Sequence, residues 1–154
     1  MNIRLREVEP ADLPIFFADQ QDAVAVEMVM FRSRERPEFD QHWAKILANE
    51  ACGKQTILAD GQVAGNIVSW NSDGQREIGY WISRSFWGRG VATAAVTAFL
   101  QLEQTRPLHA GVAKHNAGSL RVLQKCGFTF LRDSDGEPVI SDGTHLLLIL
   151  EKRD

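Results

Sequence analysis

Residues 77–93 read EIGYWISRSFWGRGVAT. The run is typical of a strand over 77–82, a turn at Gly88 and Gly90, and a helix over 91–103. The first N–H groups of a helix have no partner within it, and the helix dipole adds about half a positive charge there. Because glycine lets the backbone approach a ligand closely, the run predicts an anion site, with a pyrophosphate as the expected ligand.

Two common phosphate-binding loops do not fit this run. A Walker A loop continues with Gly-Lys and then Ser or Thr, whereas Gly90 is followed by Val91 and Ala92. A dinucleotide-binding loop needs glycine or alanine where Thr93 stands, and an acidic residue about twenty positions later. Nucleoside triphosphates and NAD are therefore disfavoured. From this run alone, a capped helix whose glycines only form a turn stays open as the alternative.

Turn signals divide the rest of the chain into short elements. Asp-Gly pairs, which accept the positive φ of tight hairpins, stand at residues 60–61, 73–74, 135–136 and 142–143. The expected strands are residues 3–8, 56–59, 63–70, 77–82, 108–113, 128–132 and 144–151. The expected helices are residues 11–20, 39–48, 91–103 and 117–126, the third being apolar enough for a central helix. The sequence predicts one α/β (α+β) domain over residues 1–154, with a mixed, mostly antiparallel sheet of about seven strands flanked by helices.

Composition excludes several classes of partner. The 154 residues carry 17 Lys and Arg against 20 Asp and Glu, without the basic excess that nucleic acids demand. The charged start is unlike a signal peptide, and no apolar run approaches the roughly 18 residues of a membrane span, so a cytoplasmic location is expected. Cys52 and Cys126 are expected to be free thiols, and the four histidines lack the spacing of metal ligands, so no metal is expected.

A second motif lies at residues 116–128, which read NAGSLRVLQKCGF and predict a helix that ends at Gly127. Together with residues 77–93, it resembles the GNAT superfamily of acyl-CoA N-acyltransferases. In that family the turn reads Gln or Arg, two residues, Gly, one residue, and Gly or Ala; here it falls on residues 87–92, and Trp87 departs at the first position. The Ile-Gly-Tyr-Trp run and the later Asn-x-x-Ser resemble the branch of ribosomal-protein N-terminal alanine acetyltransferases.

The resemblance implies how coenzyme A would bind. Backbone N–H groups of the glycine turn and the first helical turn would hold its pyrophosphate, and the Arg89 side chain would add a charged contact. The pantetheine arm would pair with the strand, where an N–H near Trp81 or Ile82 would stabilise the oxyanion. Asn116 would contact this arm, and Ser119 would lie near the leaving sulfur. The implied cofactor-binding residues are Tyr80, Trp81, Ile82, Gly88, Arg89, Gly90, Val91, Ala92, Thr93, Asn116 and Ser119.

Two residues are candidates for catalysis. Many family members place a tyrosine, as general acid, four residues after the Ser119 position, where this chain has Leu123. Ser119 would instead donate a hydrogen bond to the leaving thiolate, which needs only modest help because free thiols have a pKa of about 8.5. Glu77 shares a face of its strand with Gly79 and Trp81, and as the base it would deprotonate the amine through water. A solvated strand end is the alternative for Glu77.

Residues 31–43 are candidates for acceptor binding, because this region of the family usually walls the acceptor pocket. Arginine side chains would recognise a carboxylate of the acceptor, and aromatic side chains would pack against its apolar part. The arginines are Arg32, Arg34 and Arg36, and the aromatic residues are Phe31, Phe39 and Trp43; Phe31, Arg32 and Trp43 are the predicted acceptor contacts. A charged surface turn over packed aromatic residues is the alternative.

The resemblance implies an N-acetyltransferase that moves an acetyl group from acetyl-CoA, its co-substrate, to a primary amine by direct attack in a ternary complex. The implied acceptor is a small molecule or the N-terminus of a peptide or protein, without nucleic acid, membrane or metal. Because the usual tyrosine is missing, an acyl-CoA-binding sensor or partner module with little turnover stays the alternative. Dimers are common in this family, so the resemblance also allows a homodimer.

Overall fold

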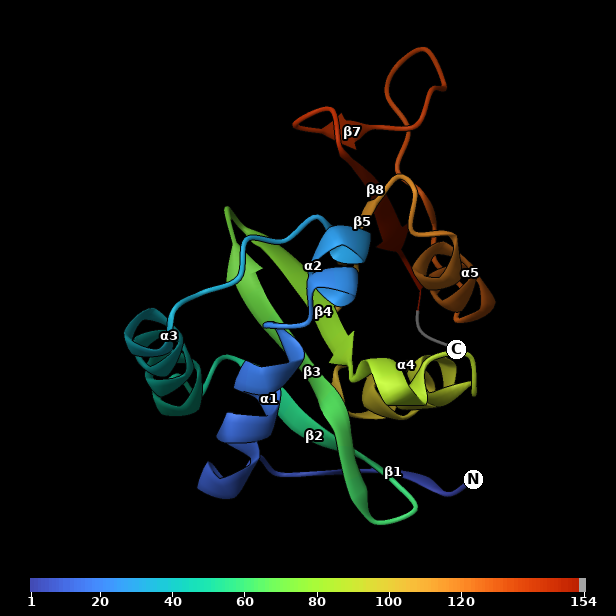
Figure 1. Ribbon diagram of the computed structural model, residues 1–154. Coiled ribbons are helices and arrows are strands. Elements are labelled where there is room, and N and C mark those ends of the chain that lie inside the picture. Colours follow the sequence, from blue (N-terminus) through green and yellow to red (C-terminus); the bar gives the residue numbers. More distant parts are fainter. Residues whose placement is uncertain (153–154) are drawn as a thin grey trace.

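An eight-stranded sheet forms the centre of the computed structural model, which describes residues 1–152 (Figure 1). Its strands are β1 (Ile3–Arg6), β2 (Gly53–Ala59), β3 (Gln62–Ser72), β4 (Gln75–Ile82), β5 (Leu108–Ala113), β6 (Thr129–Phe130), β7 (Ile140–Ser141) and β8 (His145–Leu150). Their order is β1-β2-β3-β4-β5-β8-β6, and β7 also pairs with β8. All paired strands are antiparallel except β4 and β5. The predicted mixed, mostly antiparallel sheet is confirmed.

Three of the four Asp-Gly pairs form the tight hairpins that the sequence predicts. Both residues have positive φ at Asp60-Gly61 between β2 and β3, at Asp73-Gly74 between β3 and β4, and at Asp142-Gly143 between β7 and β8. Two successive positive φ angles match the twist of the flanking strands. In the fourth pair only Gly136 has positive φ, at 80°, and this pair lies in the loop between β6 and β7.

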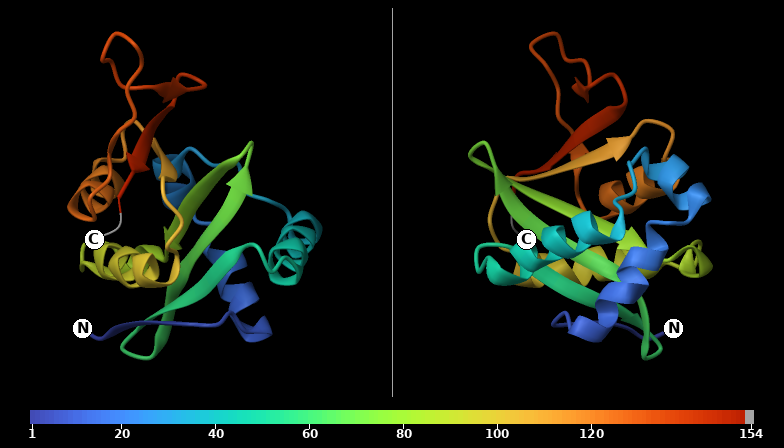
Figure 2. Two further views of the ribbon diagram at one scale, coloured as in Figure 1. Left: turned by 180° about the vertical axis from the view of Figure 1, so that it is seen from behind. Right: turned by 60° about the vertical axis from the view of Figure 1, so that its left-hand side comes forward.

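Helices cover both faces of the sheet (Figure 2). They are η1 (Pro10–Asp12), α1 (Leu13–Asp19), α2 (Ala23–Val29), α3 (Arg36–Ala48), η2 (Arg84–Phe86), α4 (Val91–Leu102) and α5 (Ala117–Lys125). On one face, Phe16 of α1 packs with Phe39 and Trp43 of α3 against Val63 and Val68 of β3. α4 and α5 cover the other face. No helix within residues 1–152 has both the length and the apolar character needed to span a membrane.

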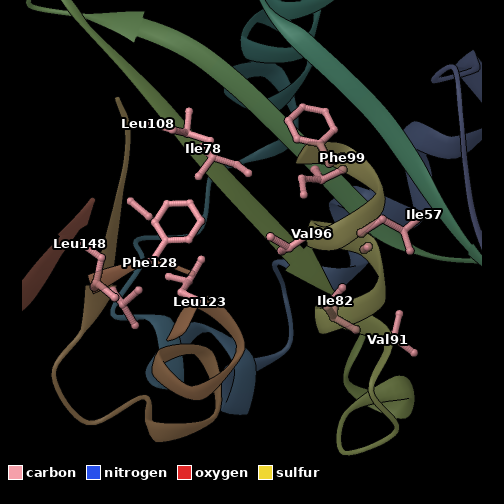
Figure 3. Close-up of a cluster of buried hydrophobic side chains, with 14 of the residues drawn as sticks. Ile57, Ile78, Ile82, Val91, Val96, Phe99, Leu108, Leu123, Phe128 and Leu148 are labelled. Carbon is pink, nitrogen blue, oxygen red and sulfur yellow. The ribbon is translucent and has the colours of Figure 1, made fainter. Parts of the chain in front are cut away.

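The larger hydrophobic core lies between the sheet and the pair α4 and α5 (Figure 3). Phe99 of α4, Ile78 of β4, Leu123 of α5 and Phe128 are almost fully buried in it. Each such side chain contributes about 1.5–3 kcal/mol through burial. Leu123 thus has a packing role at the position where many GNAT sequences carry tyrosine. This core holds α4 and α5 against β4, which fixes the elements that carry the predicted site.

Three features differ from the sequence prediction. α2 and β7 were not expected, because each is short and α2 reads AVAVEMV, without a helical stripe of apolar residues. Local contacts define α2: the Asp22 side chain accepts the Val24 N–H at 3.0 Å, and Met30 ends the helix with a left-handed φ of 52°. The helix expected to be central, α4, buries one face and leaves Leu102 61% exposed, because only that face meets the sheet.

β4 and β5 pair only where they begin. Arg76 pairs with Leu108 and Glu77 with His109, and the two strands then diverge (Figure 2, right). On its other side β4 pairs with β3 along its whole length. One edge of β4 is therefore left without a strand partner over residues 78–82, next to the turn that leads into α4.

Candidate active site

Two cavities meet at the free end of β4. The first has a volume of about 540 Å³ and lies between β4, the glycine turn, α4, α5 and α2. The second has a volume of about 510 Å³ and lies between β3, β4, α3 and residues 31–34. Tyr80 and Trp81 line both cavities. Groups bound in the two cavities therefore lie next to each other, as a reaction between two substrates requires.

The free edge of β4 presents backbone groups of Tyr80 and Ile82. Ser83 donates its backbone N–H to the Ala64 carbonyl of β3 at 2.8 Å. Because backbone groups alternate in direction along a strand, Trp81 also directs its N–H and carbonyl toward β3. Tyr80 and Ile82 direct theirs away from β3, to the edge where a ligand with amide groups can pair.

Trp87 fixes the turn that follows β4. Its indole N–H donates to the Ile82 carbonyl at 2.8 Å, and the Ile82 N–H stays available for a ligand. Of the two N–H groups predicted as oxyanion donors, only that of Ile82 is directed away from β3. The backbone of Trp81 is engaged within the sheet, so only its side chain can contact a ligand.

The glycine turn has the geometry of an anion site. Gly88 and Gly90 have φ of 75° and 77°, and a Cβ atom added to either would meet no protein atom within 4 Å. Gly90 is the N-cap of α4 and has no side chain to accept the first helical N–H groups. Gly88, Gly90, Val91, Ala92 and Thr93 all line the first cavity. The space beside both glycines is thus open to a ligand that accepts hydrogen bonds from the backbone.

Helix α5 brings two predicted residues to the first cavity. Asn116 caps this helix, because its side-chain oxygen accepts the Ser119 N–H at 3.1 Å. The Ser119 hydroxyl forms a hydrogen bond with the Tyr80 hydroxyl. Burial raises the pKa of Tyr80 to about 12, although the hydrogen bond with Ser119 opposes the rise. The phenol therefore stays protonated near neutral pH and can act as a hydrogen-bond donor.

The second cavity is walled by aromatic side chains, and no Asp or Glu among the described residues lines it. Phe31 meets Trp81 edge-on with ring centroids 5.4 Å apart, and Trp43 also lines this cavity. Its basic side chains are Arg34 and His42, and the Tyr80 hydroxyl and the Cys52 thiol also line it. Burial, aided by the charge of Arg34, lowers the pKa of His42, so the imidazole is neutral near pH 7.

The model of the acetyltransferase (GNAT) domain family matches residues 2–129. This chain belongs to the GNAT family. The match covers both the strand with its glycine turn and the helix that carries Ser119.

Two curated GNAT relatives come from Bacillus subtilis. YdaF, provisionally named a ribosomal N-acetyltransferase, is 31% identical over 122 residues, which are 74% of this chain and 62% of YdaF. YjcK, provisionally named an N-acetyltransferase, is 43% identical over 56 residues, or 33% of this chain and 30% of YjcK. This chain thus spans less than two thirds of the length of either relative.

Solved structures share the fold at low sequence identity. Spermidine N-acetyltransferase from Vibrio cholerae, solved with CoA and spermine, superposes with a TM-score of 0.79 at 14% identity over 97% of this chain and 95% of that chain. The aminoglycoside acetyltransferase AAC(6')-Ib, solved with coenzyme A and kanamycin, gives a TM-score of 0.79 at 17% identity over 98% and 95% of the two chains. These likenesses confirm the GNAT fold.

Three predicted residues lie outside the two cavities of this GNAT chain. The Arg89 guanidinium carbon lies 5.9 Å from the Phe86 ring centroid, and Arg89 lines neither cavity. Glu77 also lines neither cavity, although Trp70, its pairing partner on β3, lines the second. Arg32 points to solvent, with 77% of its side chain exposed, and pairs with Glu38 at 2.8 Å. The predicted ligand contacts of these three side chains have no support in the observed geometry.

The first cavity also contains residues that the sequence analysis did not assign. Arg121 and Lys125 of α5 line it and add positive charge. They stand three and seven residues after Gly118, so helical periodicity puts them on one face, and this spacing was the signal that could have found them. α2 closes the other side with Met28 and Val29. No comparable signal was available for α2, since the fold alone brings it there.

Tyr80 is the most informative residue whose side-chain role the sequence analysis did not predict. Only its main chain was expected to bind the cofactor, yet the chain's single tyrosine brings its hydroxyl to Ser119. A phenol is therefore present in the cavity although the usual position holds Leu123. The strand alternation that groups Tyr80 with Ile78 and Ile82 was a partial signal, because that face packs on α5.

Proposed function

We propose that this chain transfers the acetyl group of acetyl-CoA to a primary amine. One observation carries the proposal: the glycine turn, the start of α4 and Tyr80 and Ile82 of the free β4 edge line one cavity, which adjoins a second one at Tyr80 and Trp81. This arrangement suits an anionic cofactor with amide groups in the first cavity and an acceptor in the second. Membership of the GNAT family and the similarity to two N-acetyltransferases from Bacillus subtilis support the same reaction class.

The first cavity fits coenzyme A. Backbone N–H groups of residues 88–93 are suited to its pyrophosphate, and the cationic side chains of Arg121 and Lys125 to its phosphate charge. The amides of the pantetheine arm can pair with the free edge of β4 at Tyr80 and Ile82. Acetyl-CoA supplies the activated acetyl group when bound.

In the proposed reaction, a C–N bond forms between the amine and the acetyl carbon, and the C–S bond of the thioester breaks. The Ile82 N–H stabilises the negative charge that develops on the carbonyl oxygen, and one such donor contributes about 3 kcal/mol in comparable sites. The Ser119 hydroxyl, oriented by the Tyr80 phenol, donates a hydrogen bond to the departing sulfur. His42 is our candidate for the base that takes the amine proton, because it lines the second cavity. Its lowered pKa leaves the imidazole neutral near pH 7, and a neutral imidazole can accept the proton.

Amine-dependent release of free thiol tests this function. The protein is incubated with acetyl-CoA and with amino acids, alkyl and aryl amines, polyamines or peptides with free N-termini, and products are identified by mass spectrometry. We expect acetylated amine and free thiol in equal amounts. If coenzyme A binds but no amine accelerates thiol release, the acyl-CoA-binding sensor replaces the enzyme. If coenzyme A does not bind, both functions are excluded.

Replacing Ser119 tests the proposed chemistry. Ser119→Ala should lower kcat about 10-fold to 100-fold, because the leaving sulfur loses its hydrogen-bond donor, while a thiolate remains a fair leaving group without it. The Kd for coenzyme A, measured by calorimetry, should change less than threefold. Ser134→Ala, in the exposed loop between β6 and β7, is the control and should match the parent protein. An unchanged kcat in Ser119→Ala would remove Ser119 from the mechanism.

A further inference from the structure

Three arginines that the sequence suggests as carboxylate ligands have different environments. Arg32 pairs with Glu38 at 2.8 Å, and Arg36 pairs with Asp40 at 2.9 Å, both on exposed surface. Among residues 1–152, Arg34 has no carboxylate within ion-pair distance. Its half-buried side chain lines the second cavity. Of the three, only Arg34 has a guanidinium that is available to a ligand of that cavity.

The structure holds Arg34 in place from two sides. Its backbone N–H donates to the Gln20 side-chain oxygen at 3.3 Å, and its carbonyl accepts from the Gln21 side chain at 3.1 Å. Its guanidinium carbon lies 5.1 Å from the centroid of the Phe31 ring. Phe31 in turn packs against Trp81, which lines both cavities. The Arg34 guanidinium is thus separated by one aromatic ring, that of Phe31, from Trp81 at the boundary between the two cavities.

The charge of the second cavity restricts its ligand. Arg34 and His42 are its basic side chains, and neither cavity is lined by an Asp or Glu within the described part of the chain. A polyamine or another polycation would meet a cationic side chain there and no carboxylate to offset it. The aromatic walls, by contrast, suit an apolar body. The aromatic residues are Phe16, Phe31, Phe39, Trp43, Trp70, Tyr80 and Trp81.

We propose that the acceptor is a primary amine that carries a carboxylate on an apolar body, as apolar amino acids do, and that Arg34 binds this carboxylate. The inference rests on the proposed acetyl transfer and adds the substrate class of the same site. The planar guanidinium matches a carboxylate with two parallel hydrogen bonds. The aromatic side chains then hold the body, with the amine directed toward Trp81 and the first cavity.

Matched pairs of amines test the proposal. L-Phenylalanine is compared with 2-phenylethylamine, and L-leucine with 3-methylbutylamine, with spermidine as the polycation. kcat/KM is measured from thiol release at pH 8 and expressed on the concentration of free amine, because the paired amines differ in pKa. We expect each acid to exceed its decarboxylated partner at least tenfold, and spermidine to be the poorest acceptor.

Arg34→Gln should lower kcat/KM for the acids about 10-fold to 100-fold, mainly through KM, and change it less than threefold for the decarboxylated amines. Arg32→Gln is the matched control and should behave as the parent, because the Arg32 side chain is exposed and pairs with Glu38 at 2.8 Å. If decarboxylated amines are acetylated as well as the acids, or if Arg34→Gln leaves KM for the acids unchanged, the proposed role of Arg34 is wrong while acetyl transfer stands.

Binding provides a readout that does not depend on turnover. L-Phenylalanine is titrated into the complex with coenzyme A, and quenching of tryptophan fluorescence is followed, since Trp43, Trp70 and Trp81 line the second cavity. We expect saturable quenching in the parent and in Arg32→Gln, and at least a tenfold weaker Kd in Arg34→Gln. Equal binding by both variants, or none by the parent, would overturn the inference. A failure of every amine in the thiol assay would instead overturn the proposed function.

Discussion

Gly90→Glu should abolish coenzyme A binding in a chain that still folds, with Kd raised at least 100-fold. A Cβ at this position meets no protein atom within 4 Å, so a side chain would project into the first cavity without disturbing the core. The carboxylate would occupy the place proposed for the pyrophosphate and repel it. The left-handed φ of 77° adds a strain of about 1–2 kcal/mol for a residue with a side chain. Calorimetric titration with coenzyme A measures the loss.

Gly74→Glu is the matched control for this experiment. Gly74 has a φ of 78° and equally open space, but it lies in the hairpin between β3 and β4, outside both cavities. The two variants should therefore lose similar stability in thermal unfolding, and only Gly90→Glu should lose coenzyme A. If Gly90→Glu binds coenzyme A as tightly as Gly74→Glu does, the anion site lies elsewhere.

Asp12→Asn should lower the free energy of unfolding by about 2–4 kcal/mol. The Asp12 carboxylate, whose side chain is 3% exposed, accepts two hydrogen bonds from the Arg6 guanidinium at 2.7 and 2.8 Å. It also accepts the Thr56 hydroxyl at 2.7 Å and the Glu9 N–H at 2.9 Å. The carboxylate thereby ties β1, η1 and β2 together. An amide cannot accept all four bonds and leaves the Arg6 charge without its partner.

The pH dependence of unfolding gives an independent check. Burial opposes ionisation of Asp12, but its hydrogen bonds with Arg6, Glu9 and Thr56 prevail and lower its pKa from 3.8 to about 2. A lowered pKa means that this stabilisation is complete above about pH 4 and is lost as the pH falls toward 2. Urea unfolding at pH 7 and pH 3 should show a smaller loss for Asp12→Asn at pH 3.

Asp40→Asn is the control for this pair of measurements, because it removes an exposed ion pair with Arg36. Such pairs contribute about 0–1 kcal/mol, so this variant should stay close to the parent. An Asp12→Asn protein as stable as Asp40→Asn at pH 7 would show that the carboxylate network adds nothing.

Most elements of the fold follow from short-range patterns. The Asp-Gly turns require positive φ, and β4 alternates between Ile78, Tyr80 and Ile82 on one face and Gly79 and Trp81 on the other. Such patterns involve only neighbouring residues, so they could be predicted. α2 could not be, because seven residues without a periodic stripe form a helix here through an N-cap at Asp22 and a left-handed Met30.

The candidate site likewise has some features that neighbouring residues determine and others that depend on the tertiary structure. The glycine turn and the helix that ends at Gly127 were expected from residues adjacent in the chain, and the structure has both: α5 ends at Lys125, and Gly127 has a φ of 98°. Which arginine faces the second cavity, which N–H is free on β4 and which phenol reaches Ser119 depend on contacts between distant segments. Tyr80 and Ser119 are 39 residues apart in the chain, and Phe31 and Trp81 come from different elements.

The sequence alone therefore determined the strand, the turn and the helix start that form the anion site, because φ preferences and unpaired helical N–H groups are local properties. Only the tertiary structure decided that β5 leaves β4 after Glu77, that Tyr80 meets Ser119, and that Arg34 lines a cavity while Arg32 does not. These outcomes depend on how helices pack on the two faces of one sheet, and no local pattern specifies which side chains that packing leaves without partners.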